Sequence, residues 1–126
     1  WAERLYSAAD REESALYAKR LEEALRNALT ISDATPELNT LMGLAFLAQG
    51  KDVGEAITFL QEAVQQSPID QGSRLLLASA YLHDYQPRRA IEIAESVLSF
   101  EHESNAATAS AHELIDLAEA MLREQN

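Results

Sequence analysis

Hydrophobic side chains recur every three or four positions along most of the chain, with polar side chains between them. This spacing places the hydrophobic residues on one face of an α-helix, so the chain is predicted to be helical. The pattern is clearest between Leu41 and Pro68, where two amphipathic segments flank a turn that contains Gly50. The packing positions of the two segments are Met42, Gly43, Phe46, Ala56, Leu60 and Ala63. This stretch therefore predicts a helical hairpin.

Breaks in the pattern divide the chain into further helices. Helices are predicted over residues 11–31, 37–48, 55–66, 71–82, 88–100 and 106–124, with a short one before residue 10. Thr35 and Asp70 carry the side-chain oxygens that a helix N-cap requires, and Pro36 and Pro87 suit the first position of a helix. The core face predicted for the last helix is Ala107, Ala111, Leu114, Ala118 and Met121.

The first 31 residues contain neither Gly nor Pro. Asp10 followed by Glu13 fits a capping box, in which each side chain binds a free backbone amide, and this predicts that a new helix begins there. The packing face predicted for that helix is Tyr17, Leu21, Leu25 and Ala28. Charged residues around its other faces are expected to be solvated, with opposite charges paired at neighbouring helical positions.

The helical hairpin recurs along the chain. Ala56 and Ala90 are 34 residues apart (90 − 56), and Phe46 and Tyr81 are 35 apart (81 − 46). A hairpin that recurs at this period is the sequence signature of a solenoid, in which each repeat packs on its neighbours. The second set of packing positions is Leu77, Ala78, Tyr81, Ala90, Ala94 and Val97.

On these two sets of positions the chain resembles the tetratricopeptide repeat (TPR) family. The Leu-Gly pair of the family pattern corresponds to Met42-Gly43 and to Leu77-Ala78. Phe46 and Tyr81 stand at the following Tyr, and Pro68 stands at the Pro that closes a repeat. The second-helix positions are Ala56, Leu60 and Ala63, and then Ala90, Ala94 and Val97.

The sequence departs from the family pattern at several positions. Asn39 and Arg74 replace the early Trp, and His102 replaces the second closing Pro. The turn of the first hairpin carries one extra residue. Glu12 stands where the Tyr of an earlier repeat would be, so the N-terminal segment is either a degenerate repeat or a helical cap.

The resemblance implies an all-α fold, a TPR-like right-handed α-solenoid of antiparallel helix hairpins with a C-terminal capping helix. A single TPR-like domain then covers residues 1–126. Its expected parts are a degenerate repeat or helical cap at 1–35, repeats at 36–69 and 70–103, and a capping helix at 104–126.

The formal charge of −11 argues against a nucleic-acid ligand and against an anionic membrane surface, because both need clustered Lys and Arg. The absence of Cys excludes disulfides and thiolate chemistry but leaves both cytoplasm and periplasm open. No apolar run approaches the roughly 20 residues of a membrane span, so no direct membrane contact is expected. The chain opens at Trp1 without a signal-peptide pattern, and we expect a fragment or a processed form.

The resemblance also implies a function, the binding of a protein or peptide in a concave groove lined by the first helix of each repeat. The predicted groove residues are Thr40, Leu44, Leu47, Leu75, Ser79, Leu82 and His83. They lack the Lys, Arg and Asn with which some TPR domains hold a C-terminal carboxylate. An amphipathic helix or apolar peptide suits such a groove, and the acidic chain favours a basic partner. The alternative is a structural or self-assembly module whose groove is filled by its own first helix, by another copy in a homo-oligomer or by the rest of the parent chain.

The sequence predicts no catalytic, metal or cofactor site. His102-Glu103 and His112-Glu113 do not fit the HExxH spacing of a zinc site, and His83 is expected at the surface. Residues 50–54, GKDVG, lack the spacing and the preceding strand of a phosphate-binding loop. No Ser/His/Asp constellation can be assembled, so an enzyme is not expected.

Overall fold

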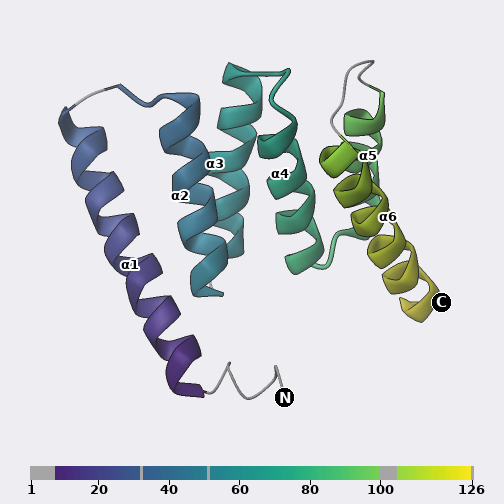
Figure 1. Ribbon diagram of the computed structural model, residues 1–126, viewed down its shortest axis with the longest axis horizontal. Coiled ribbons are helices and arrows are strands. Elements are labelled where there is room, and N and C mark those ends of the chain that lie inside the picture. The colour runs from purple at the N-terminus through teal and green to yellow at the C-terminus, as the bar shows by residue number, and fades with distance from the viewer. Residues whose placement is uncertain (1–7, 32, 51, 100–104, 126) are drawn as a thin grey trace.

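The computed structural model describes residues 8–31, 33–50, 52–99 and 105–125, and the structural statements below concern these residues. They form six α-helices and no strand. The helices are α1 (Ala8–Ile31), α2 (Pro36–Gln49), α3 (Val53–Gln66), α4 (Gln71–His83), α5 (Pro87–Leu98) and α6 (Asn105–Gln125). Successive helices run antiparallel and stand side by side from α1 at one end to α6 at the other (Figure 1).

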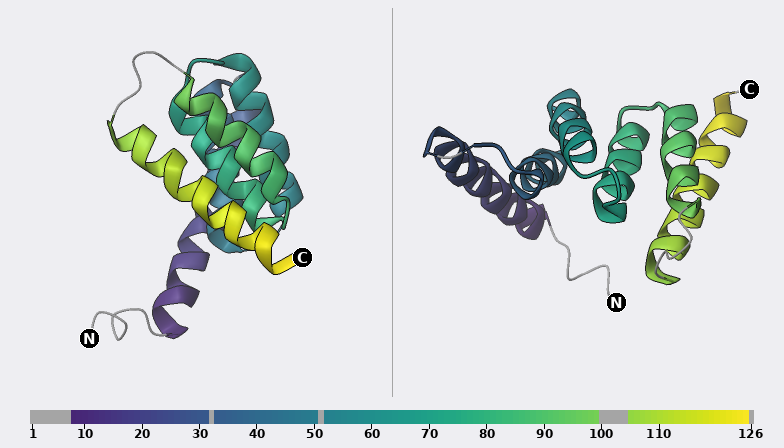
Figure 2. Two further views of the ribbon diagram at one scale, coloured as in Figure 1. Left: turned by 90° about the vertical axis from the view of Figure 1, so that its right-hand side faces the viewer. Right: turned by 90° about the horizontal axis from the view of Figure 1, so that it is seen from above.

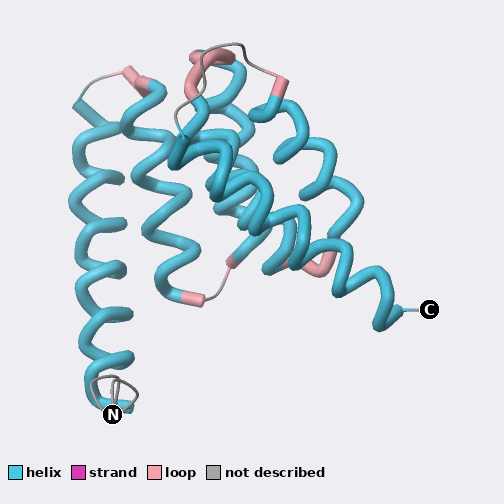
Figure 3. The backbone as a smooth tube through the Cα atoms, turned by 45° about the vertical axis from the view of Figure 1, so that its right-hand side comes forward, coloured by secondary structure: helices cyan, strands magenta, loops and turns pink. Residues whose placement is uncertain are grey.

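The stack has two layers. Viewed from above, α2 and α4 lie in one layer and α3 and α5 lie in the other (Figure 2). Each helix packs mainly on the helices before and after it, and α4 also contacts both α2 and α6. The turns between α3 and α4 and between α4 and α5 are short (Figure 3). The chain is therefore a TPR-like helical solenoid, as the sequence predicts.

The helix starts follow the local signals in the sequence. The side chain of Thr35 accepts a hydrogen bond from the backbone N–H of Leu38 at 3.2 Å, and Pro36 begins α2. Asp70 Oδ1 accepts from the backbone N–H of Gly72 at 3.0 Å at the start of α4. Both predicted N-caps are thus confirmed, because each satisfies an amide that has no partner within its helix.

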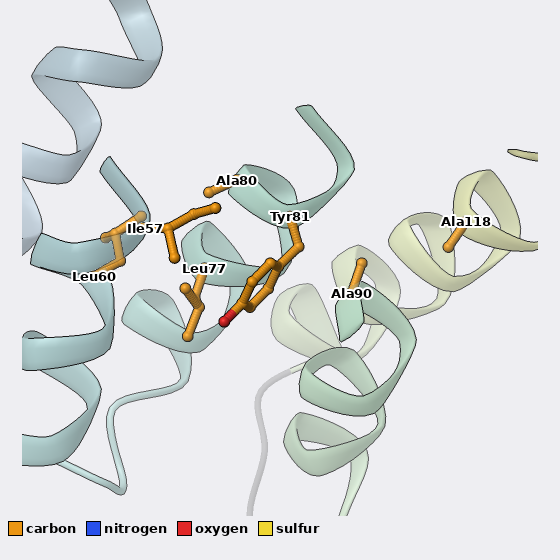
Figure 4. Close-up of a cluster of buried hydrophobic side chains, with 7 residues drawn as sticks. All are labelled: Ile57, Leu60, Leu77, Ala80, Tyr81, Ala90 and Ala118. Atoms are coloured by element: carbon orange, nitrogen blue, oxygen red, sulfur yellow. The ribbon is translucent and has the colours of Figure 1, made fainter. Parts of the chain in front are cut away.

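Small residues allow the helices of each hairpin to approach closely. Gly43 of α2 faces the fully buried Leu60 of α3, and a Cβ atom added to Gly43 would lie 2.7 Å from Leu60 Cδ2 and closer still to Cγ. At the matching place of the next hairpin, Ala78 is also fully buried. Between the hairpins, Ile57 of α3 lies beside Leu77 and Ala80 of α4 (Figure 4).

A second part of the core joins α1 to α2 and α3. Phe46 is buried beside Met42, Ala56 and Leu25, and its ring stacks on Phe59 with 5.9 Å between ring centroids. Polar contacts close the outer edge of this cluster. Glu22 of α1 binds Arg26 at 2.7 Å and accepts a hydrogen bond from Gln49 of α2 at 2.9 Å. The Glu22–Arg26 pair is one of the helical-neighbour pairs that the sequence predicts.

The predicted helix start at Asp10 is wrong. α1 runs without a break from Ala8 through Asp10 and Glu13, so no capping box begins a helix there. The physical reason is that the residues around this point are mostly Ala, Glu and Arg, which propagate a helix well. The short helix predicted before residue 10 falls mainly on residues 1–7, which lie outside the described part of the chain.

The packing face predicted for α1 is half wrong. Leu25 is buried as expected, but Tyr17 is 60% exposed and Leu21 is 39% exposed. The buried stripe instead runs through Ala18 and Leu25 toward the partly buried Leu29. The difference arises because, among the described helices, α1 packs principally on α2, and these helices leave the other sides of α1 uncovered.

The hairpins fall within the expected repeat segments. α2 and α3 lie within residues 36–69, and α4 and α5 lie within residues 70–103. α6 covers the end of the array, and its predicted core face is buried or half-buried. The division into a cap or degenerate repeat, two repeats and a capping helix stays a prediction.

Candidate partner-binding groove

α2 has neighbours on three sides. Met42 lies in the cluster shared with α1, and Gly43 faces α3. Toward α4, the hydroxyl oxygen of Thr40 lies 2.9 Å from that of Ser73, which is itself almost fully buried. The remaining side of α2 is the one that no described helix covers.

This open side of α2 is lined by an exposed stripe at helical spacing. Its members are Glu37, Leu41, Leu44 and Ala48. Leu41 is 39% exposed and Leu44 is 42% exposed, although most large apolar side chains of α2 are buried or half-buried. These two neighbouring leucines expose apolar surface to water, and a partner that covers this surface would be stabilised in the complex.

The matching side of α4, 35 residues further on, is more polar. Gly72 and His83 are exposed, and Leu76 and Ser79 are half-buried. Neither open side carries Lys or Arg, because Arg74, the only basic residue of the two helices apart from His83, points elsewhere and donates to Pro68 O at 2.8 Å. These two faces therefore offer an apolar centre without a basic clamp for a carboxylate.

The predicted groove residues divide between the open faces and the seams between helices. Leu44, Ser79 and His83 lie on the open faces described above. Thr40 lies in the seam between α2 and α4, where its hydroxyl group also donates to Pro36 O at 2.8 Å. Leu47 is half-buried in the same seam, packed against two core clusters.

Leu75 and Leu82 are also half-buried. Leu75 packs against the cluster formed with α5 and α6, and Leu82 packs against the cluster in which α3, α4 and α5 meet. Their role in partner binding stays a prediction. Leu41 is not among the predicted groove residues, although its spacing of three residues from Leu44 indicates a shared helical face.

The two replacements of the family Trp have a structural role. Asn39 is buried at the start of α2 and donates to Gln66 Oε1 at the end of α3, at 2.8 Å. Arg74 is at the start of α4 and donates to Ser96 Oγ near the end of α5, at 2.9 Å. In both hairpins a polar side chain therefore links the start of the first helix to the end of the second helix.

A separate hollow of about 280 Å³ lies between the α4–α5 turn and the end of α6. It is lined by Tyr85, Gln86, Pro87, Arg88, Arg89 and Leu122. The guanidinium carbon of Arg89 lies 5.9 Å from the centre of the Tyr81 ring, an arrangement that favours a cation–π contact. This hollow is at the side of the array and does not adjoin the open leucines of α2.

Within the described ranges, no three His, Asp or Glu side chains gather closely enough to hold a metal ion. His83 and His112 are both exposed, and His102 lies outside the described residues. None of the described helices combines the length and the apolar character needed to cross a membrane.

Comparison with known proteins gives one result that bears on this fold. A family model described as tetratricopeptide repeat matches residues 46–115, which is more than half of the chain. The match begins at Phe46 of α2, passes through α3, α4 and α5, and ends in α6. A search of curated proteins finds no match.

Proposed function

Because the chain belongs to the tetratricopeptide repeat family, whose members are generally non-catalytic interaction scaffolds, we propose that it holds a helix or peptide of a protein partner against the open sides of α2 and α4. One observation carries this proposal. Leu41 and Leu44 stay exposed on a helix whose other three sides are packed. Covering what remains exposed of each leucine would contribute about 1 kcal/mol to binding.

The rigidity of α2 supports the same proposal. Its start is held by the Thr35 cap and by the Asn39–Gln66 hydrogen bond, and its side is tied to α4 through Thr40 and Ser73. A surface that is ordered before binding loses little conformational entropy when a partner docks, so a modest apolar contact can still bind.

The negative charge of the chain supports a partner with basic residues. The chain carries 21 acidic and 10 basic residues, and Glu37 continues the leucine stripe toward the start of α2. We therefore expect an amphipathic helix with an apolar face and Lys or Arg on its flanks. Opposite charges of this kind raise the association rate and orient the partner, and salt should weaken the complex.

Selection from a displayed library of random peptides tests this proposal. We expect the selected peptides to repeat apolar residues at helical spacing with basic flanks, and to bind about tenfold more weakly to a Leu41→Glu/Leu44→Glu variant. Leu117→Glu is the matched control, because Leu117 is an exposed leucine on the outer side of α6. Circular dichroism checks that both variants fold.

Two outcomes count against the proposal. One is that the selected peptides bind the α2 variant as tightly as the parent chain, which places the binding surface elsewhere. The other is that acidic peptides are selected as readily as basic ones, which removes the electrostatic part of the argument.

A further inference from the structure

α1 forms one end of the solenoid and packs principally against α2. Beside the face that packs on α2, α1 carries a second apolar stripe at helical spacing, which we call the outer stripe. The outer stripe consists of Tyr17, Leu21, Ala24, Ala28 and Ile31. All are exposed except Ala28, which is half-buried. Since 14 residues separate its ends (31 − 17), the stripe is about 21 Å long.

The repeat of the chain shows what kind of surface this is. Adding 35 to the residue numbers of Leu21, Leu25 and Ala28 gives the matching positions of α3. Adding a further 34 gives the matching positions of α5. In α3 and α5 all six positions are fully buried: Ala56, Leu60, Ala63, Ala90, Ala94 and Val97. In α1 only Leu25 is comparably buried. Two residues of the outer stripe, Leu21 and Ala28, therefore stand at positions that other helices cover in α3 and α5.

The other end of the solenoid differs. The outward side of α6 presents the exposed carboxylates Glu113, Asp116 and Glu119 around a single exposed leucine, Leu117. A polar outer face is what the terminal element of a solenoid needs to remain in water. One end of this array is thus polar and the other is apolar.

Charge favours a second copy as the occupant of the outer stripe. The residues of α1 include four basic and five acidic side chains, a sum of −1, although the whole chain carries −11. At the other end of the array, α6 carries four acidic side chains and one basic side chain, a sum of −3. Two of these acidic molecules therefore repel each other less where their α1 helices meet than where their α6 helices meet. Association of α1 with α6 of another copy would instead bring the acidic outward face of that α6 against a molecule that is itself acidic.

The side chains of the outer stripe also complement one another. In an antiparallel pair with a two-fold axis beside Ala24, Leu21 of one copy lies against Ala28 of the other. A large residue then faces a small one, as Leu60 faces Gly43 within the first hairpin. We propose that two copies of the chain associate through their outer stripes in such a two-fold pair, which is the commonest symmetry of protein oligomers.

Sedimentation velocity over a range of about 10 to 500 μM tests the proposal, because a single helix pair buries an area typical of weak dimers. We expect the parent chain to change from monomer to dimer with rising concentration, and Leu21→Glu to weaken the dimer about tenfold or more. The matched control Leu117→Glu should dimerise like the parent. Thermal unfolding of the monomers checks that Leu21→Glu folds, as its partial exposure predicts.

Three results would overturn the inference. The parent chain could remain monomeric throughout, as it would if the outer stripe served a different partner. The Leu21→Glu variant could dimerise normally, or Leu117→Glu could weaken the dimer equally. The selected peptides are expected to bind α2 and α4, and Leu21 belongs to α1, so the Leu21→Glu variant should still bind them. Failure of this inference is then distinct from failure of the proposed function.

Cross-linking gives an independent test, since the chain contains no Cys. An Ala24→Cys substitution places a thiol beside the two-fold axis, where the two thiols can reach disulfide distance. We expect this variant to form a disulfide dimer under mild oxidation much faster than Ala109→Cys, which places a thiol on an exposed site of α6. Equal rates for the two variants would contradict the proposed pair.

Discussion

Gly43 offers a test of the close approach between α2 and α3, because the sign of the effect depends on that approach. In an open helix, replacing Gly by Ala stabilises the protein by about 1 kcal/mol, since Ala loses less backbone entropy on folding. At Gly43 the added methyl group would lie 2.7 Å from Leu60 Cδ2 and closer to Cγ. Leu60 is fully buried among other core side chains, so it can move away only by displacing them.

The expected magnitude follows from these two opposing contributions. Overpacking a well-filled core costs about 1–3 kcal/mol, and the gain in helix propensity offsets about 1 kcal/mol of it. The overlap of the added methyl group with Leu60 is severe, which places the overpacking cost in the upper half of its range, about 2–3 kcal/mol. We therefore expect Gly43→Ala to lower the free energy of unfolding by about 1–2 kcal/mol. At this chain length that corresponds to a fall of about 4–8 °C in the unfolding temperature.

Urea and thermal unfolding followed by circular dichroism measure this change. Gly54→Ala is the matched control, because Gly54 is also in a helix and an added Cβ atom there meets nothing within 4 Å. That variant should be as stable as the parent or more stable. In a Leu60→Ala background the cost of Gly43→Ala should disappear, which a double-mutant cycle detects. If Gly43→Ala stabilises the parent chain as Gly54→Ala does, the argument from close packing is refuted.

Three further predictions concern helix ends and turns. Asn39→Ala should destabilise the fold by about 1–3 kcal/mol, because it removes a buried hydrogen bond and leaves Gln66 without this donor; urea unfolding measures the loss. Asp70→Ala should cost about 1 kcal/mol through loss of the α4 N-cap, with Asp70→Asn retaining most of the stability in the same titration. Tyr85 has a left-handed backbone conformation with φ of 57° and an exposed side chain, so Tyr85→Gly should stabilise by about 0.5–1 kcal/mol, seen as a higher unfolding temperature. An unchanged or lower temperature for that variant would contradict the argument from backbone strain.

The features that were predicted well from the sequence are those set by local chemistry. Thr35, Pro36 and Asp70 mark helix starts through hydrogen bonds or backbone geometry within a few residues, so the surrounding fold has little influence on them. The repeat period likewise lies in the sequence itself, and the paired positions Gly43 and Ala78 are buried as the resemblance implies.

The errors concern which apolar face of a helix is covered. On α1 the spacing of Tyr17 and Leu21 is as good as that of Ala18 and Leu25, and only the presence of α2 on one side decides between them. The same ambiguity explains why Leu41 was missed on α2. Periodicity identifies apolar stripes, but the neighbouring helices determine which stripe is buried.

The position of α1 at the end of the array has a consequence for local unfolding. A helix held by one principal neighbour can detach at a smaller free-energy cost than α3 or α4, which are packed on both sides, and the remaining hairpins keep their own cores. Amide hydrogens of α1 should therefore exchange with solvent faster than those of α3. If two copies pair through α1, its exchange should slow as concentration rises while that of α3 changes less, so association would selectively protect a helix that the single chain holds from one side.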